Sequence, residues 1–574
     1  MATLPEQFFV TAKKFPDKTA LKYKQSGAYL ELTFNELAKQ IKTVAQALLK
    51  LGLSPTERVA VLAPNCPEWV MLDLGIMLAG GITVPIHTTF SPKLIAGVIK
   101  NSNAQILVVS TQEQLNKIGL IISEIPQVRK IIYLNADYLN NLPAKLATAW
   151  ADFLCLTSTE TVWPKIEAKD ICSIIYTSGT TGEPKGVALT HKNFLSDAQA
   201  CAQVVPVTKE DTLLSLLPLS HVFERTAGYY TPLLFAGATI AYAESFKEFS
   251  KNLREVNPTI LVSVPRVFEK MQDSIWQKMR QRGKFTLKLF YWALKQPSGS
   301  VTQWLAELLI LKKIRKALGT NFRFAIAGGS ALSLRQAKFF NKIGLAVYQG
   351  YGLTEASPVV ATNYPAQQER GTVGKALPGV EIKIANDKEI LVRGPNVMKG
   401  YWEDDEATRE ALDEQGYLHT GDLGHLSNQG YLTIIGRKKE MIVTAGGKNF
   451  WPEILEEKLN ETKYISQTMV IGNNRKHLAA LIVPDWINLK RYLQENKIEV
   501  PQDEILNQPS VLQLYRQNIN TATQYLAEYE KIIKFVLVVN EFTQEREELT
   551  PTLKLRRSVI ATHYKKEIEQ MYFE

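Results

Sequence analysis

Hydrophobic residues recur at helical spacing near the start of the chain and in short aliphatic runs further along it. Between Thr33 and Leu51 one helical stripe is formed by Leu37, Ile41, Val44, Ala45 and Leu48. Short apolar runs follow at residues 58–63, 105–110, 128–134 and 238–243. Strands that alternate with amphipathic helices are typical of parallel sheets covered on both faces. The pattern therefore predicts an α/β fold, with a large N-terminal domain of parallel or mixed sheets.

The hydrophobic pattern changes after Gly379. The segments VEIKIA, EILVRG and YLTIIGRK alternate apolar and polar residues between Gly, Asn and Asp turns, which predicts a small antiparallel, barrel-like sheet. Beyond Arg437 we expect a helix at 452–459, strands at 468–471 and 479–483, and a long helical stretch. We therefore predict an N-terminal domain over residues 1–436 and a small α+β C-terminal domain over residues 437–574.

Composition narrows the class of protein. The 574 residues are 45% hydrophobic and 22% charged, as in ordinary globular chains. The four cysteines show no C-x-x-C spacing, which excludes a disulfide framework or a zinc knuckle and favours a reducing compartment. The most apolar run, 69–86, contains Asp73 and a Gly80-Gly81 break, so it predicts a buried helix and a strand rather than a membrane span. We expect a cytoplasmic protein, with peripheral attachment to the inner face of a membrane as an alternative.

Much of the net charge of +10 lies in one segment. Residues 270–316 contain eleven Lys or Arg residues and only two acids, Asp273 and Glu307. We expect this segment to be a helical basic insertion at about 270–318. No nucleic-acid recognition motif accompanies the segment, so nucleic acid is not an expected partner. An anionic membrane surface is one interpretation of it. The other is a pair of packed helices with a solvated cationic face.

The sharpest chemical feature is the stretch YTSGTTGEPKGV, which runs from Tyr176 to Val187 after an apolar strand. Glycines and small residues let backbone N–H groups approach phosphate oxygens, and Lys185 adds a positive charge. Gly186 follows that lysine where a Walker A loop requires Ser or Thr, so the stretch is not a Walker A loop. A Ser/Thr/Gly loop without a ligand is the plain structural alternative.

These twelve residues instead resemble the phosphate loop of the adenylate-forming enzymes, which include acyl-CoA synthetases, peptide-synthetase adenylation domains and luciferases. Further motifs follow in the order of that superfamily: LPLSHVFE at 217–224, AGGSA at 327–331, QGYGLTE at 349–355, HTGD at 419–422 and GRKK at 436–439. Any one of these motifs could be an ordinary core or turn segment. Together, in this order, they favour the functional interpretation.

The resemblance implies a role for each motif. Lys554, Lys185 and His221 would be catalytic, and Thr180 and Glu355 would bind Mg²⁺. Mg²⁺ prefers few protein oxygens together with phosphates and water, and one carboxylate such as that of Asp422 can accept from both ribose hydroxyls. ATP or AMP would be bound by Thr177, Ser178, Gly179, Thr180, Thr181, Gly182, Lys185, Gly329, Ser330, Gln349, Gly350, Tyr351, Gly352, Thr354, Asp422 and Arg437.

Within the superfamily the chain resembles the long-chain fatty-acyl-CoA synthetases, through LPLSHVFERT, GYGLTEASPVV, EILVRGPNVMKGYW and VTAGGKNFWPE. The resemblance implies a fatty acid:CoA ligase that uses ATP, Mg²⁺ and coenzyme A. Two positions depart from common family patterns. Arg225 stands where some relatives have a gating tryptophan, and Leu553 stands where a glycine usually precedes the catalytic lysine.

The resemblance further implies two half-reactions. A fatty acid would be adenylated first; the mobile C-terminal domain would then turn about Lys439 and bring Gly446 and Gly447 to a channel for coenzyme A. Two alternatives remain. One is an acyl-AMP ligase that delivers to acyl carrier protein, although the insertion typical of such ligases is absent between Lys439 and Pro452. The other is a non-catalytic acyl or nucleotide sensor on the same fold, against which the intact motif residues argue.

Overall fold

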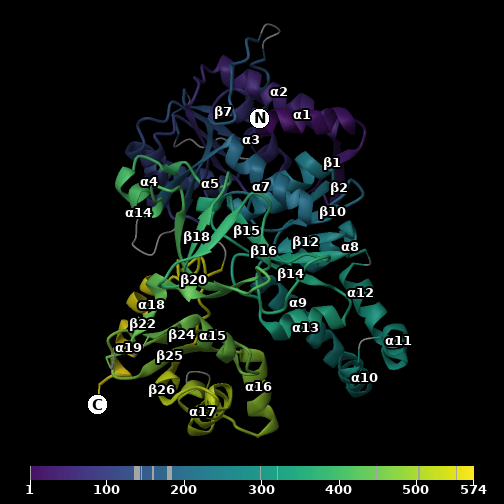
Figure 1. The fold of residues 1–574 in the computed structure, drawn as a ribbon, viewed down its shortest axis with the longest axis vertical. Helices are drawn as coiled ribbons and strands as arrows, with labels where there is room; N and C mark the ends of the chain where they lie inside the picture. Colours follow the sequence, from purple (N-terminus) through teal and green to yellow (C-terminus); the bar gives the residue numbers. More distant parts are fainter. Residues whose placement is uncertain are drawn as a thin grey trace. The chain divides into compact units, whose positions relative to one another are not determined.

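The chain folds into two compact units. Unit 1 comprises Met1–Lys383, Leu391–Thr420 and Leu426–Thr433, and unit 2 comprises Ile384–Ile390, Gly421–His425 and Ile434–Glu574. Figure 1 shows their elements coloured along the sequence. The computed structural model describes residues 2–134, 142–143, 145–157, 161–177, 184–297, 299–319, 321–445, 449–501, 504–550 and 553–573, with the backbone alone at 317, 449 and 529.

One sheet of unit 1 has eight strands in the order β19-β9-β8-β4-β3-β5-β6-β7. Neighbours from β8 to β7 pair in parallel, whereas β9 is antiparallel to β8 and β19. Strands β4 and β5 are buried along their whole length, which explains their unbroken apolar sequence. The strands are β3 (Arg58–Leu62), β4 (Ile82–Pro85), β5 (Ile106–Val109), β6 (Lys130–Tyr133), β7 (Ala147–Ala149), β8 (Ile171–Thr177), β9 (Lys185–Thr190) and β19 (Gly400–Tyr401).

The second sheet of unit 1 has nine strands in the order β16-β15-β14-β13-β12-β10-β11-β1-β2. Its neighbours from β14 to β1 pair in parallel, and the strands outside them are antiparallel. The strands are β1 (Thr19–Gln25), β2 (Ala28–Thr33), β10 (Thr212–Ser215), β11 (Thr239–Tyr242), β12 (Ile260–Ser263), β13 (Phe324–Ala327), β14 (Val347–Gly352), β15 (Val359–Thr362) and β16 (Lys375–Ala376).

Helices connect the strands of unit 1. Helix α2 begins where Thr33 and Glu36 form a capping box, and its buried stripe is the one expected from the sequence. The helices are α1 (Leu4–Lys14), α2 (Phe34–Lys50), α3 (Pro67–Leu78), α4 (Pro92–Ser102), α5 (Gln112–Ile121), η1 (Ile122–Glu124), α6 (Trp150–Leu154), α7 (His191–Val204), the π-helix η2 (Glu224–Ala236), α8 (Phe249–Val256), α13 (Leu334–Lys342), η4 (Thr354–Ala356) and α14 (Asp405–Ala411).

A group of five helical segments fills residues 265–318, between β12 and β13. The segments are α9 (Pro265–Gln281), α10 (Lys284–Lys295), α11 (Val301–Ala306), η3 (Glu307–Leu311) and α12 (Lys312–Leu318). In Figure 1, α10, α11 and α12 lie together beyond α9, at one end of unit 1. The basic residues noted in the sequence are distributed over these helices.

A four-stranded sheet has the order β17-β18-β20-β21, and each strand contributes residues to both units. The strands are β17 (Glu381–Ile384), β18 (Glu389–Arg393), β20 (Leu418–Leu426) and β21 (Leu432–Arg437). Three of them are the alternating segments expected after Gly379. Strand β20 was not expected from the sequence, because Gly421 and Gly424 interrupt the alternation of LHTGDLGHL.

Unit 2 also contains a three-stranded sheet, β24-β25-β26, and a β22-β23 pair. The predicted long helical stretch is wrong in extent: it is two helices followed by β26, which pairs in parallel with β25. The elements are η5 (Lys438–Glu440), β22 (Ile442–Val443), β23 (Asn449–Phe450), α15 (Pro452–Asn460), β24 (Ile465–Ile471), β25 (Leu478–Pro484), α16 (Trp486–Glu495), η6 (Ile505–Asn507), α17 (Pro509–Thr523), η7 (Glu528–Glu530), β26 (Ile532–Leu537), α18 (Arg557–His563) and α19 (Lys565–Gln570).

The α/β fold class is confirmed, with large mixed sheets in one unit and smaller α+β elements in the other. The apolar run at 69–86 is a buried helix, α3, followed by strand β4, as predicted. Within the described part of the chain, no helix combines the length and the apolar character needed to cross a bilayer.

Candidate active site

The phosphate-loop stretch joins two paired strands of the eight-stranded sheet. Thr177, the last residue of β8, lies opposite Lys185, the first residue of β9, so the two ends of the loop are held by the sheet. The predicted loop residues between them lie outside the described residues: Ser178, Gly179, Thr180, Thr181 and Gly182. The described ends therefore fix where the loop begins and returns.

Lys185 lies beside an aromatic side chain that the sequence analysis did not single out. Its Nζ is 5.3 Å from the ring centroid of Tyr401 and 3.8 Å from Oδ2 of Asp404. Strand β19 places this tyrosine, because Tyr401 pairs with Val187 on β9. The Lys185 side chain remains 41% exposed, so the ammonium group is accessible to an anionic ligand.

The same tyrosine links Lys185 to Glu355, the predicted metal ligand. The Tyr401 hydroxyl donates to Oε1 of Glu355 over 2.9 Å. The Glu355 carbonyl accepts from the Met398 amide at 2.8 Å, which ties the residue to the chain that leads into β19. The structure thus brings Lys185 and Glu355 together around Tyr401. The only sequence signal for this tyrosine was its place in the KGYW segment.

The turn that carries Thr354 and Glu355 is fixed from both sides. The Asn396 amide donates to the carbonyls of Ala356 and Val359 at 2.9 and 3.2 Å, and the Ser357 hydroxyl donates to the Asn396 carbonyl at 2.7 Å. All these groups are buried, so each hydrogen bond avoids an unsatisfied polar atom. The position of η4 is therefore determined by the surrounding backbone.

The predicted adenine-binding residues follow the ends of two neighbouring parallel strands. Ala327 of β13 pairs with Gln349 of β14, so the AGGSA turn with Gly329 and Ser330 begins beside Gln349. Gly329 has φ +81°, a conformation that favours glycine. The strand continues through Gly350 and Tyr351 to Gly352, which meet residues 359–362 of the antiparallel strand β15.

Gly352 is required by a close backbone approach. A Cβ atom at this position would lie 2.0 Å from the carbonyl oxygen of Pro358, at a backbone atom that cannot rotate away. The returning chain after η4 therefore crosses β14 at a point where only hydrogen fits. This contact explains the second glycine of the QGYGLTE stretch without reference to a ligand.

His221 is connected to the AGGSA turn through Phe223. The Phe223 amide donates to Nδ1 of His221 over 3.2 Å, which orients the imidazole. The Phe223 ring then packs on Gly328, where a Cβ atom would come within 2.6 Å of the ring. The structure thus brings the predicted acyl-site segment into contact with the predicted adenine-binding turn.

Arg225, at the position where some relatives have a tryptophan, is fully buried. It forms an ion pair with Asp73, and its Nη1 and Nε donate to the hydroxyls of Ser173 and Tyr230 at 2.7 and 2.8 Å. The Tyr230 hydroxyl donates in turn to the second carboxylate oxygen of Asp73. The network satisfies both buried charges and locks η2 against α3 and β8. Arg225 therefore has a structural role.

Glu224, the preceding residue, is a buried acid that the sequence analysis assigned no role. The residue is 1% exposed, and burial raises the pKa of its carboxyl to about 8, although a hydrogen bond from Ser215 at 2.6 Å acts in the opposite direction. The carboxyl is thus mostly protonated at neutral pH. It also lies against Gly228, where any Cβ atom would clash with it.

Unit 2 brings together three of the predicted site residues. Nε of Arg437, at the end of β21, donates to Oδ1 of Asp422 on β20 over 2.8 Å. Asp422 and Arg437 are also the neighbouring charges that act on Lys554. Reduced hydration lowers the pKa of the Lys554 ammonium, with repulsion from Arg437 as the next cause, while nearby carboxylates raise it. Part of the Lys554 side chain remains exposed. Because the charges of Arg437 and Asp422 act on it, Lys554 lies close to this candidate ribose-binding pair.

The segment before Lys554 contains an unusual backbone conformation. Leu553 has φ +63°, in the left-handed region that favours glycine. The Leu553 amide donates to the Thr550 carbonyl over 2.8 Å. The Thr550 amide donates to the Lys554 carbonyl, also over 2.8 Å. These hydrogen bonds form a tight turn that positions Lys554. The positive φ of residue 553 explains why a glycine is common there. The predicted hinge residue Lys439 lies in η5, and the predicted channel residues Gly446 and Gly447 lie outside the described residues.

This fold and these motifs define an adenylate-forming enzyme. The chain belongs to the AMP-binding enzyme family, whose model matches residues 8–402, and the model of the AMP-binding enzyme C-terminal domain matches residues 439–574. Within that family it belongs to the long-chain acyl-CoA synthetase branch.

Relatives of that branch are similar over nearly the whole chain. The long-chain-fatty-acid–CoA ligase FadD15 of Mycobacterium bovis is 33% identical, over 97% of this chain and 95% of the relative. The long-chain-fatty-acid–CoA ligase ACSBG2 of Xenopus laevis is 31% identical, over 99% of this chain and 84% of the relative. The family assignment therefore covers both units.

Solved structures share the fold. The anthranilate CoA ligase AuaEII in complex with anthranoyl-AMP aligns with a TM-score of 0.77 and 21% identity, covering 99% of this chain and 98% of the other. ATP-bound MatB from Rhodopseudomonas palustris gives 0.73 and 22%, covering 99% and 100%. A Mycobacterium tuberculosis fatty acyl CoA synthetase gives 0.66 and 22%, covering 98% and 99%. At these identities the likeness concerns the fold.

Proposed function

We propose that the protein is a long-chain fatty acid:CoA ligase (AMP-forming), which converts fatty acid, ATP and coenzyme A into acyl-CoA, AMP and pyrophosphate through an acyl-adenylate. The observation that carries this proposal is the similarity over 97% of the chain to ligases named for this activity. The Lys185–Tyr401–Glu355 arrangement and the Asp422–Arg437 pair beside Lys554 support it.

In the first half-reaction the fatty carboxylate attacks the α-phosphorus of ATP, and pyrophosphate leaves. This step mainly requires positioning and neutralisation of phosphate charge. Lys185 and Thr354 contact phosphate, Tyr351 stacks on adenine, Asp422 and Arg437 hold the ribose, and Lys554 bridges the carboxylate and the α-phosphate. His221 lines the acyl site beside the AGGSA turn. The remaining nucleotide contacts come from the phosphate loop 177–182 and from Gly329, Ser330, Gln349, Gly350 and Gly352.

Mg²⁺ fits the carboxylate of Glu355, which lies with Lys185 at Tyr401. Glu355 offers a carboxylate on a rigid turn, and among the described residues no group of three or more His, Cys, Asp or Glu forms a dedicated metal cage. This agrees with the preference of Mg²⁺ for one or two carboxylates together with substrate phosphates. We propose Glu355 and Thr180 as its ligands; the ion would offset the charge on the leaving pyrophosphate.

In the second half-reaction the thiol of coenzyme A attacks the acyl-adenylate, and AMP leaves. We propose that a C-terminal domain over residues 437–574 turns about Lys439 between the two steps. Gly446 and Gly447 would then line the channel for the pantetheine arm. The glycine pair leaves room for a narrow chain, because neither residue carries a side chain.

A discriminating assay measures pyrophosphate and thioester separately. With Mg-ATP and palmitate, we expect one equivalent of pyrophosphate per active site without a thiol, and turnover when coenzyme A is added. Each buried CH₂ contributes about 0.8 kcal/mol, so an acid two carbons shorter than the optimum should bind roughly tenfold less tightly. Release of no pyrophosphate would favour a sensor, and a requirement for acyl carrier protein in place of coenzyme A would favour an acyl-AMP ligase.

We also propose that a cytoplasmic form of the protein docks on an anionic membrane surface through residues 270–316. Phe285, which follows Lys284 in α10, and Trp304 of α11 are 81% and 63% exposed, as expected for a surface that contacts lipid headgroups. Co-sedimentation with vesicles of anionic lipid should fall in high salt and on charge reversal at Lys284, Lys288 and Lys312. Equal binding to neutral and anionic vesicles would contradict this proposal.

A further inference from the structure

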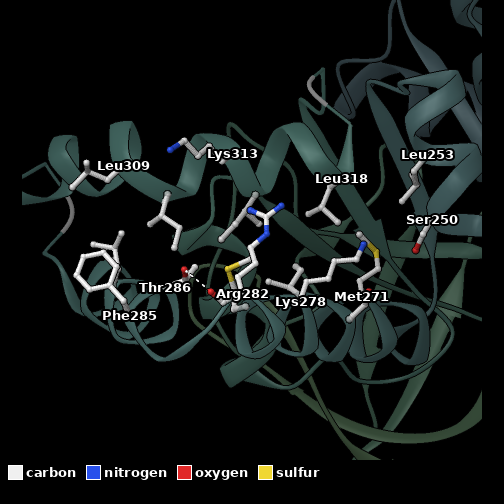
Figure 2. A pocket seen from close by; sticks show the side chains of 16 residues that line it. Ser250, Leu253, Met271, Lys278, Arg282, Phe285, Thr286, Leu309, Lys313 and Leu318 are labelled. Carbon is white, nitrogen blue, oxygen red and sulfur yellow. Dashed lines mark hydrogen bonds between the residues drawn. The ribbon is translucent and has the colours of Figure 1, made fainter.

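A cavity of about 210 Å³ lies within the helical group 265–318 and has no assigned role. It is bounded by α9 and α10 on one side and by η3 and α12 on the other, with α8 closing one end. Figure 2 shows the lining side chains in the space between these helices. The lining residues are Ser250, Leu253, Met271, Ser274, Ile275, Lys278, Met279, Arg282, Phe285, Thr286, Leu289, Leu309, Ile310, Lys313, Ile314 and Leu318.

Ten of the sixteen residues that line this cavity are apolar. Met271, Ile275 and Met279 form one buried stripe along α9 at i, i+4 and i+8, and Ile310 and Ile314 face the cavity from the opposite helices. Methionine side chains adapt to flexible ligands, since they are unbranched and polarizable. The α9 residues that line the cavity, Met271 to Met279, span about 12 Å at 1.5 Å per residue, and Arg282 lies just beyond the end of this helix. This row of apolar side chains along one helix is complementary to an extended alkyl chain.

Three cations stand at this apolar cavity: Lys278, Arg282 and Lys313. Each is exposed, and none of them forms an ion pair with another residue that the structure describes. On the same helical segments, Glu307 pairs with Arg315 at 2.6 Å and Glu269 pairs with Arg266 at 2.7 Å. In Figure 2 the Arg282 guanidinium extends into the space between the two helical layers.

No acidic side chain occurs among the described lining residues, so the positive charge at the cavity is not neutralised there. An apolar cleft with unpaired guanidinium and ammonium groups is complementary to an amphiphile that carries one anionic head. A guanidinium can hold a carboxylate through two parallel hydrogen bonds. The cavity has room for one alkyl chain rather than two, since a 150 Å³ apolar cavity already holds a molecule of benzene.

We propose that this cavity is a second, non-catalytic binding site for a free long-chain fatty acid. The carboxylate lies at Arg282 and Lys278, and the alkyl chain lies between α9 and α12. None of the lining residues belongs to the motifs assigned to ATP, the acyl group or coenzyme A. The choice of a fatty acid rests on the proposed function, because the ligase must take up this substrate from dilute solution or from a membrane.

Equilibrium dialysis of the full chain against radiolabelled dodecanoate, below its micellar concentration, measures how many fatty acid molecules each protein binds. A non-hydrolysable dodecanoyl-adenylate occupies the active site, so that residual dodecanoate reports the cavity. We expect about one residual equivalent for the wild type. Arg282→Glu should weaken residual binding at least tenfold, and Ile275→Trp should abolish it by filling the cavity. Lys316→Glu, the same charge change on α12 outside the lining, should leave it unchanged.

Several outcomes would overturn this inference while leaving the proposed function intact. These are no residual dodecanoate, equal residual binding in Arg282→Glu and Lys316→Glu, or displacement of the residual ligand by dodecanoyl-CoA or phosphatidic acid vesicles more readily than by unlabelled dodecanoate. Because Arg282 is exposed, this variant should fold even if Ile275→Trp does not. Failure of the wild type to bind the adenylate analogue and to release pyrophosphate would instead contradict the proposed function.

Discussion

Two arginine–aspartate pairs lie in different surroundings in the two units. In unit 1, both side chains of the Arg225–Asp73 pair are 0% exposed, and hydroxyl groups surround them. In unit 2, the side chains of Arg437 and Asp422 are 42% and 9% exposed. A buried pair is tolerated when all its hydrogen bonds are made, whereas a pair whose arginine is partly exposed can exchange its partner for a ligand. The same two residue types thus serve structure in one unit and are available for binding in the other.

Removing one member of each pair gives the largest expected contrast. Asp73→Asn leaves a buried guanidinium without its counter-ion and should lower the free energy of unfolding by about 3–5 kcal/mol. Asp422→Asn should cost about 1 kcal/mol or less but raise KM for ATP strongly. Urea denaturation and ATP kinetics measure the two effects. Equal losses of stability would show that the difference in exposure does not separate the two roles.

Lys554 and Gly446 should separate the two half-reactions. A well-placed electrostatic donor is worth about 2.7–4 kcal/mol, so Lys554→Ala should slow pyrophosphate release by about a hundred- to a thousandfold. Supplied with preformed acyl-adenylate, this variant should still form acyl-CoA. Gly446→Leu should show the reverse pattern, with one round of pyrophosphate release and no thioester. Thermal melts confirm folding, and equal damage to both steps in both variants would rule out the proposed rotation.

Glu224 tests whether the buried charges of unit 1 respond to pH. Its pKa in the folded state is about 8, above the ordinary value of a glutamate. Between these two values the unfolded chain loses the proton while the folded protein keeps it, so the free energy of unfolding falls as the pH rises. Wild-type stability should fall between about pH 5 and 8 relative to Glu224→Gln, by a few kcal/mol. Unfolding curves across this range measure the difference. Parallel curves for both proteins would mean that another buried group controls the pH dependence.

Tyr401→Phe removes the hydrogen bond to Glu355 but keeps the aromatic ring beside Lys185. A hydrogen bond to a charged group contributes roughly 1.5–3 kcal/mol, so we expect a roughly ten- to hundredfold lower kcat/KM, with an increased requirement for Mg²⁺. Stability should change little, because the tyrosine is only partly buried. Tyr401→Leu, which removes the ring as well, should be more severe. An unchanged Mg²⁺ dependence in the phenylalanine variant would argue against a role in orienting the metal ligand.

The smallest effect is expected at the turn before Lys554. Leu553→Gly relieves the left-handed conformation, which costs a non-glycine residue about 1–2 kcal/mol, although added freedom in the unfolded chain offsets part of the gain. We expect a net stabilisation of unit 2 by up to about 1 kcal/mol and unchanged adenylation. Hydrogen exchange at the Lys554 amide measures the local effect. Slower adenylation would mean that the leucine side chain itself positions the lysine.

The sequence predicted well those elements whose burial is uniform along the chain. The runs that became β3, β5, β6 and β11 are continuous apolar segments, and α2 has one clear stripe and a capping box. The strand β20 and the strand β26 were missed, because their exposed polar positions and partial burial give no clean period. The sequence also suggested one long helix after residue 483, whereas the structure has two helices, and the second begins at Pro509.

The motif residues could be identified from the sequence, but their supporting residues could not. Tyr401 and Asp404 reach Lys185 through the pairing of β19 with β9, which joins segments more than two hundred positions apart. Asp73 was noted as a reason against a membrane span, yet its partner Arg225 could be recognised only from the packing of η2 on α3. Long-range pairing of this kind leaves no local pattern in the sequence.

Gly352 has a consequence for how the ancestry of such proteins is interpreted. Since the carbonyl of Pro358 leaves no space for a side chain, natural selection would retain this glycine even in a descendant that had lost all chemistry. Lys554, the proposed catalytic lysine, is exposed and has no such steric protection, so it would change once catalysis was no longer needed. A survey of distant homologues should therefore weigh the lysine, rather than the glycine motif, when separating working enzymes from inactive copies.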